Sequence, residues 1–176
     1  TWKSRGLGDV YKRQENNSGE NIEVFPYRLI KRINTPDTIN FFILHEGLIS
    51  LINDELLEKN YDDIADDCNS SMQTKKEFCD NKTQGGWLGF TDKYWMSALI
   101  PDADQSINVN YRYGNNGRDS YRAGYVGQIY KINSGENISY GGKLFVGAKK
   151  LNVLSAYDEN LSIPRFTDAI DWGWFS

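Results

Sequence analysis

Short runs of alternating apolar and polar residues, separated by turn signals, fill the chain after Pro101. The strand-like runs VNYRYGNNGRDSYRAGYVGQIYKI and NISYGGKLFVG are punctuated by the turn sequences Gly-Asn-Asn-Gly, Ser-Gly-Glu-Asn and Gly-Gly. Turn residues at this spacing, between segments rich in tyrosine and valine, are typical of β-hairpins. The pattern predicts a meander of antiparallel strands and therefore a mainly β fold.

The first half of the chain carries three further strand signals. IEVFPYRLI alternates from Ile22 onward, and Pro26 within it indicates an edge or bulged strand. INFFILHEG is apolar enough for a central strand. GLISLINDELLEKNY predicts two strands joined at Asn53-Asp54, because both residues tolerate turn conformations. A helix over ELLEKNY is the alternative.

Two segments break the strand pattern. Residues 62–86 are polar and charged, which predicts a surface loop or insertion. In AKKLNVLSAYDENL the apolar residues recur at helical spacing, which predicts an amphipathic helix that ends before Pro164; these residues are Leu151, Leu154, Tyr157 and Leu161.

The first fourteen residues, TWKSRGLGDVYKRQ, have neither helical nor strand periodicity. DVYKRQ also resembles the translation of an adapter used in sequencing libraries. We therefore expect residues 1–14 to be an artefactual or unrelated leader with no place in the fold.

Bulk composition narrows the classes of partner. The formal charge of -4 and the pI near 5.1 argue against nucleic acid, whose binders concentrate lysine and arginine on one face. No apolar run approaches the roughly 20 residues that cross a bilayer. Cys68 and Cys79 lack the paired spacing of a zinc or redox motif, so they form either a disulfide or two reduced thiols.

Candidate catalytic and binding groups give no active site. His45 is the only histidine, and no nucleophile motif accompanies it, so a structural strand histidine is favoured over a catalytic base. The acidic residues 62–67 lack the spacing of a calcium loop, which favours a solvated loop. Arg112, Arg118 and Arg122 alternate with tyrosines, as in a surface on which single-stranded nucleic acid stacks. The alternative is a β-hairpin with cross-strand pairs of tyrosine and arginine, and the acidic net charge favours it. We predict no enzyme activity, metal or cofactor.

An aromatic stretch, GGWLGFTDKYW, is either core or a partner surface. It belongs to GGWLGFTDKYWMSALIPD, which is preceded by FFILHEGLISLINDELLEKNYDDI and followed by LFVGAKKLNVLSAYDENLSIPRFTDAIDWGWFS. In this order the three motifs resemble the periplasmic domain of the YidC family of bacterial membrane protein insertases, in its alphaproteobacterial form. The resemblance covers most of residues 41–176.

The resemblance implies part of an antiparallel β super-sandwich over residues 15–147, then a C-terminal helix and membrane-proximal segment over residues 148–176. The implied function is insertion and folding of inner-membrane proteins, alone or with the Sec translocon, from the periplasmic side of the bacterial inner membrane. Nascent membrane proteins, Sec components and lipid would be the partners. A carbohydrate-binding or sugar-modifying domain is the alternative, because similar sandwiches handle sugars. A free-standing module that recruits proteins by a strand edge is a third.

The resemblance also suggests roles for two sets of aromatic residues. A turn at Gly85-Gly86 would lead into a buried aromatic core; this set is Trp87, Phe90, Tyr94 and Trp95. A second set would lie near the membrane, where aromatic side chains favour the interface, with Asp171 as a helix cap; it comprises Phe166, Asp171, Trp172, Trp174 and Phe175. Packing of this second set on the domain's own helix is the alternative.

Overall fold

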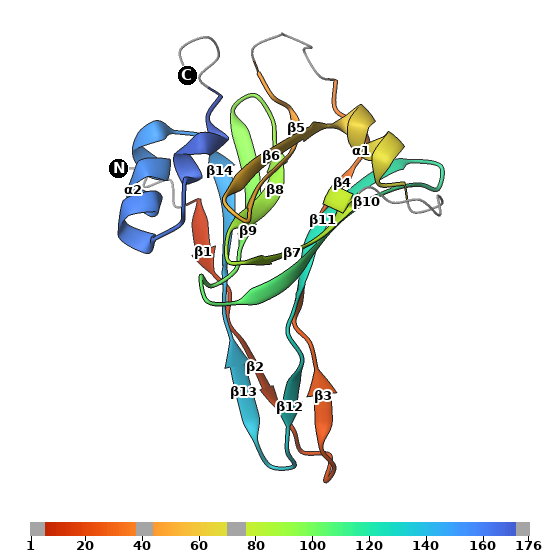
Figure 1. The fold of residues 1–176 in the computed structure, drawn as a ribbon, viewed down its shortest axis with the longest axis vertical. Helices are drawn as coiled ribbons and strands as arrows, with labels where there is room; N and C mark the ends of the chain where they lie inside the picture. The colour runs from red at the N-terminus through yellow and green to blue at the C-terminus, as the bar shows by residue number, and fades with distance from the viewer. Residues whose placement is uncertain (1–5, 38–43, 70–76, 172–176) are drawn as a thin grey trace.

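Two antiparallel sheets packed face to face form the body of the protein in a computed structural model, which describes residues 6–37, 44–69 and 77–171 (Figure 1). The six-stranded sheet has the order β1 (Leu7–Asp9), β14 (Lys143–Ala148), β9 (Trp95–Ile100), β8 (Trp87–Thr91), β5 (Gly47–Ile52) and β6 (Glu55–Asn60). The four-stranded sheet has the order β4 (Tyr27–Ile33), β11 (Asp119–Gly127), β10 (Ser106–Asn115) and β7 (Asp80–Gln84). The predicted mainly β, antiparallel fold class is confirmed.

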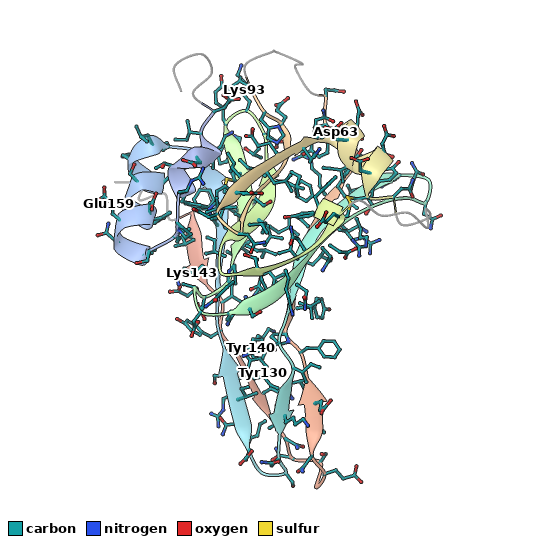
Figure 2. The ribbon with its side chains drawn as sticks, in the orientation of Figure 1. Asp63, Lys93, Tyr130, Tyr140, Lys143 and Glu159 are labelled. Carbon is teal, nitrogen blue, oxygen red and sulfur yellow. A yellow bond between two sulfur atoms is a disulfide. The ribbon has the colours of Figure 1, made fainter. Side chains whose placement is uncertain are left out.

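Two narrow ribbons extend from one end of this body (Figure 1). One pairs β2 (Lys12–Glu15) with β13 (Asn137–Tyr140), and the other pairs β3 (Ile22–Val24) with β12 (Tyr130–Ile132). The rings of Tyr130 and Tyr140 stack with centroids 6.3 Å apart and so join the two ribbons (Figure 2).

Alternate residues of the six-stranded sheet build two separate cores. On β5, Leu48 and Ile52 face the four-stranded sheet, whereas Ile49 and Leu51 face a helical layer on the other side. All six residues of β5 are buried, which explains why GLISLI is apolar without alternation. The helical layer consists of α2 (Leu151–Leu161) and the 3-10 helix η2 (Phe166–Ala169).

The hairpin predicted at Asn53-Asp54 is confirmed, because β5 and β6 pair around these residues. Both have left-handed backbone conformations, with φ of 52° and 65°. The alternative helix over ELLEKNY is wrong for its first six residues, which form β6; only Tyr61 enters a helix. The predicted turn at Gly85-Gly86 is also present, and a Cβ on Gly86 would lie 2.2 Å from the Leu51 carbonyl oxygen.

The expected surface loop at residues 62–86 is largely regular structure. Helix α1 (Tyr61–Asp67), the 3-10 helix η1 (Glu77–Cys79) and β7 occupy most of its described part. The Asn60 side chain accepts a hydrogen bond from the Asp63 backbone N–H at 2.8 Å and caps α1. The acidic residues that were expected in a loop therefore stabilise the N-terminus of a helix, because the helix dipole there attracts negative charge.

Residues 7–14 also differ from expectation, because the structure gives this part of the proposed leader a place in the fold. Leu7–Asp9 pair with β14, and Lys12–Glu15 pair with β13. Pairing partners far along the chain carry no signal within the leader itself. The predicted central strand INFFILHEG lies mostly outside the described residues; of its described residues, Leu44–Glu46 are not in a strand and Gly47 begins β5.

Candidate partner-binding and membrane-proximal sites

The first half of the aromatic stretch is core, as predicted. Trp87 is fully buried, and its ring meets that of Phe166 edge to face with centroids 5.4 Å apart. Phe145 makes a second edge-to-face contact with Phe166, also at 5.4 Å. The indole N–H of Trp87 donates to the Pro164 carbonyl oxygen at 2.9 Å. These contacts hold the helical layer against the six-stranded sheet.

Phe90 lies on the opposite face of β8 from its neighbour Thr91 and is buried in the sandwich core. Its ring stacks on Tyr61 of α1 with centroids 6.3 Å apart, and Tyr61 in turn contacts Tyr121 at 4.9 Å. Burial raises the pKa of the Tyr61 hydroxyl well above its ordinary value. Phe90 therefore connects α1 to both sheets.

The second half of the stretch is not core. Tyr94 and Trp95 are 63% and 62% exposed, which corrects the sequence-based expectation. The Asp92 N–H donates to the Trp95 carbonyl oxygen at 2.8 Å, so a tight turn joins β8 to β9 here. Tyr94 lies in this turn, beyond the end of the sheet, whereas Trp95 is the first residue of β9 and lies at the end of the strand, where neither core reaches. The polar pair Asp92-Lys93 within the aromatic run was the available signal.

Charged side chains gather around this turn, at the end of the body remote from the ribbons, where Figure 2 labels Lys93; we call it the hairpin end. Arg32 bonds Asp92 at 2.8 Å, and the Lys93 N–H donates to a Glu46 carboxylate oxygen at 3.3 Å. Burial lowers the pKa of the Lys149 ammonium, while nearby carboxylates, Asp171 foremost, act in the opposite direction. No sequence motif marks this cluster, because its members come from distant segments.

The five residues that were predicted to lie near the membrane have three different outcomes in the structure. Phe166 is completely buried, so its expected lipid or partner contact is wrong; its ring packs on Trp87 and Phe145 of the six-stranded sheet, not only on the protein's own helix as the alternative had it. Asp171 accepts a hydrogen bond from the His45 backbone N–H at 3.0 Å. Its bond ties the end of the described chain to the hairpin end. Trp172, Trp174 and Phe175 lie outside the described residues.

The two cysteines form a disulfide with their Cα atoms 5.7 Å apart. Cys68 is the C-cap of helix α1 and Cys79 is the last residue of η1, and both are buried in the sandwich core. The bond thus closes the segment between the two helices. His45 has a structural contact, since its ring Nε2–H donates to the Leu48 carbonyl oxygen at 2.7 Å.

The arginines and tyrosines of YRYGNNGRDSYRAGY separate onto opposite faces of the four-stranded sheet. Tyr111 and Tyr121 are buried in the sandwich core, while Arg112 and Arg122 are adjacent in register on the outer face. The described tyrosines and the two paired arginines therefore do not form a shared exposed surface on which bases could stack. The hairpin interpretation holds. Lys31 extends the basic row across β4, because it is paired with Arg122.

Three surface hollows in the described part of the structure were considered as sugar sites. The first lies beside α2, the second under the β10–β11 turn and the third over β7 and β10. None of the three is lined by an aromatic side chain, and their only carboxylates are Asp102 and Asp80. Asp80 already pairs with Arg112. An aromatic groove with convergent carboxylates, which a sugar site would favour, is absent from these hollows.

Two other features, a metal site and a membrane-spanning helix, are absent from the described residues. Residues 6–37, 44–69 and 77–171 contain no group of three or more metal-ligating side chains. No helix within the same ranges has the length and apolar character to cross a bilayer.

Comparison with known proteins identifies extensive similarity. Residues 8–176 match the family model described as the YidC periplasmic domain. A membrane protein insertase YidC from Dinoroseobacter shibae is 36% identical over 166 residues, which cover 94% of this chain and 27% of that protein. The corresponding protein of Rickettsia canadensis is 39% identical over 163 residues, covering 91% and 27%. That of Rhizobium johnstonii is 33% identical over 172 residues, covering 97% and 27%. The chain thus spans about a quarter of the length of these relatives.

Proposed function

The chain belongs to the YidC periplasmic domain family, and we propose that it serves as the periplasmic part of a membrane protein insertase and chaperone in a bacterial inner membrane. In this role it assists the insertion and folding of inner-membrane proteins, alone or with the Sec translocon. Its proposed partners are nascent membrane proteins, Sec components and lipid. We propose neither a catalytic role nor a cofactor for it.

The family match over residues 8–176 carries this proposal, together with relatives that share the name membrane protein insertase. The Cys68–Cys79 disulfide supports the proposed compartment, because disulfides persist in the oxidising periplasm and are rare in the cytosol. The three hollows without aromatic side chains give the sugar-binding alternative no support.

We further propose that the sandwich of residues 15–147 carries partner contacts and that residues 148–176 lead towards the membrane. Asp171 supports this orientation, because its bond to His45 places the end of the described chain at the hairpin end. Tyr94 and Trp95 are exposed there beside Lys93, a combination of aromatic and cationic side chains that suits a lipid headgroup region. In this orientation the ribbons point away from the bilayer.

A cross-linking experiment in a full-length protein tests the function. The matched region of the Dinoroseobacter shibae insertase would be exchanged for this chain, and a photo-cross-linking amino acid would replace Trp95. We expect cross-links to a ribosome-stalled membrane protein or to lipid. The same group at Lys131, an exposed residue on the β12 ribbon, is the matched control.

Two results would overturn the proposal. The first is an exchanged protein that is folded and membrane-bound but gives equal cross-links at both positions. The second is labelling of Lys131 by a membrane-impermeant amine reagent only after the inner membrane is opened, because this would place the domain in the cytosol.

A further inference from the structure

The open edge of β4 has the features of a strand acceptor. The Pro26 carbonyl accepts from Gly127 N–H and the Asn34 N–H donates to the Asp119 carbonyl, so the even-numbered residues of β4 bond to β11. By the alternation of an antiparallel ladder, four residues point their N–H and C=O groups away from β11; these are Tyr27, Leu29, Lys31 and Ile33. Within the described chain, nothing hydrogen-bonds to these outward groups.

The side chains of the same residues make this edge unusually apolar. Tyr27, Leu29 and Ile33 are 72%, 46% and 47% exposed. Natural edge strands are normally protected by charges, bulges or covering elements. Here Lys31 is the single charged residue among the four outward positions, and it lies beside Arg122 in register. The two inward-pointing arginines of β4 are held within the protein, since Arg28 donates to the Val10 carbonyl and Arg32 bonds Asp92. An edge with one charge on its outer face favours pairing with another strand.

The facing sheet leaves room for one more strand beside β4. Across the sandwich β11 lies against β8, and β4 lies against β9. The next strand of the six-stranded sheet is β14. Strands are about 4.8 Å apart in both sheets, so the next position beside β4 lies over β14. Among the described strands, the four-stranded sheet therefore has none over β14 or over β1 beyond it.

Apolar side chains on the uncovered surface agree with this geometry. Leu144 and Val146 point to the sandwich side of β14, since Phe145 between them points to the helical layer. Leu144 packs partly against the core, whereas Val146 is 58% exposed. Trp95 lies on the same side of neighbouring β9 and is exposed as well. A strand beside β4 would cover these side chains.

We propose that an extended segment of an inserting polypeptide adds to β4 as a further antiparallel strand. Its inward side chains would be apolar and cover Val146. Among its outward side chains, an acidic residue would pair with Lys31 and face the basic row that continues to Arg122. That the segment comes from an inserting protein rests on the proposed function, whereas strand addition itself rests on the geometry of β4.

A peptide titration tests strand addition on the complete 176-residue chain. The probe is a nine-residue peptide that alternates threonine and valine, with glutamate at its central threonine position. Paired with β4, it presents valine towards Val146 and glutamate towards Lys31. A second probe has lysine at the centre. We expect the glutamate probe to bind about five- to tenfold more tightly in fluorescence anisotropy, because opposite charges attract across strands and like charges repel.

Protein variants separate pairing at β4 from general charge attraction. Lys31→Glu is expected to invert the order of the two probes. Lys82→Glu is the matched control, because Lys82 is exposed at the opposite edge of the same sheet and the net charge changes equally; it should leave the order unchanged. A glutamate probe N-methylated at the residues that face β4 should lose binding, since it cannot donate to the strand.

Three outcomes would overturn the proposal. In the first, the N-methylated glutamate probe binds as tightly as the unmethylated one. In the second, Lys31→Glu and Lys82→Glu change the relative affinities of the two probes equally. In the third, no probe binds at millimolar concentration. Sedimentation that shows a dimer dissociated by Leu29→Pro would also overturn it, by assigning the edge to a second copy of the chain. The titration uses no membrane or insertase, so its failure is distinguishable from failure of the cross-linking test.

Discussion

Truncation of Phe166 to alanine tests whether the helical layer is held by an aromatic core or by contacts with the membrane. The side chain is completely buried and meets the rings of Trp87 and Phe145 edge to face. Burial of a phenylalanine contributes about 2–3 kcal/mol, and each edge-to-face pair adds about 0.5–1.5 kcal/mol. These contributions sum to about 3–6 kcal/mol. This range agrees with the loss of stability of about 3–5 kcal/mol that is typical when a buried phenylalanine is truncated to alanine.

The assay is urea denaturation of the chain without membranes, followed by circular dichroism. We expect Phe166→Ala to lower the free energy of unfolding by about 3–5 kcal/mol. Leu161→Ala is the control, because Leu161 lies on α2 but is 41% exposed, and its loss should cost about 1 kcal/mol or less. A loss below about 1 kcal/mol for Phe166→Ala would refute the packing argument and return Phe166 to the membrane-proximal set.

Three further predictions concern the disulfide, the exposed aromatic residues and a buried tyrosine. Replacing Cys68 and Cys79 by alanine should lower the unfolding free energy by about 3 kcal/mol, from the entropy of the opened loop; equal urea midpoints with and without the bond would contradict this. Tyr94→Ala and Trp95→Ala should each change stability by about 0.5 kcal/mol or less, and a melting curve shifted as far as that of Trp87→Ala would show that they are core. Burial raises the pKa of Tyr125 to about 12 from 10.0. The folded state therefore loses stability as pH rises from 10.0 towards about 12, at about 1.4 kcal/mol per pH unit, and Tyr125→Phe should remove this part of the slope in denaturation curves.

Local patterns predicted those elements whose signal lies in their own residues. The turns at Asn53-Asp54 and Gly85-Gly86 require left-handed backbone, and residue type signals this directly. Helix α2 follows the apolar spacing of its sequence, yet only Leu154 among its residues is fully buried. Leu151 and Leu161 are exposed, because the helix covers the sheet only with its middle. Periodicity thus identified the helix but not the extent of its contact.

The failures share a dependence on distant parts of the chain. Nothing near Leu7–Asp9 or Lys12–Glu15 shows that β14 and β13 can pair with them. The exposure of Tyr94 and Trp95 depends on where β8 and β9 end relative to the two cores. The cluster at the hairpin end and the uncovered face of β14 likewise arise from sheet order. No local signal encodes that order.

The six-stranded sheet is the common wall of the two cores, and this determines how the proposed sites can influence each other. Strand β9 presents Leu99 to the sandwich core, whereas Met96 and Ala98 face the helical layer. A strand added at β4 would contact only the sandwich side, and the segment that leads towards the membrane packs only on the other. Any coupling between them must therefore pass through the six-stranded sheet itself or around its strand ends, at the β8–β9 turn or at the β5–β6 turn. At the hairpin end, Asp92 bonds Arg32 of β4, and the Tyr94 carbonyl accepts the Lys149 N–H. At the opposite end of β5, Arg165 of the helical layer donates to the Asp54 carbonyl, and the Asn53 N–H donates to the Thr83 hydroxyl of β7. Both sides of the six-stranded sheet therefore meet through hydrogen bonds at these two turns.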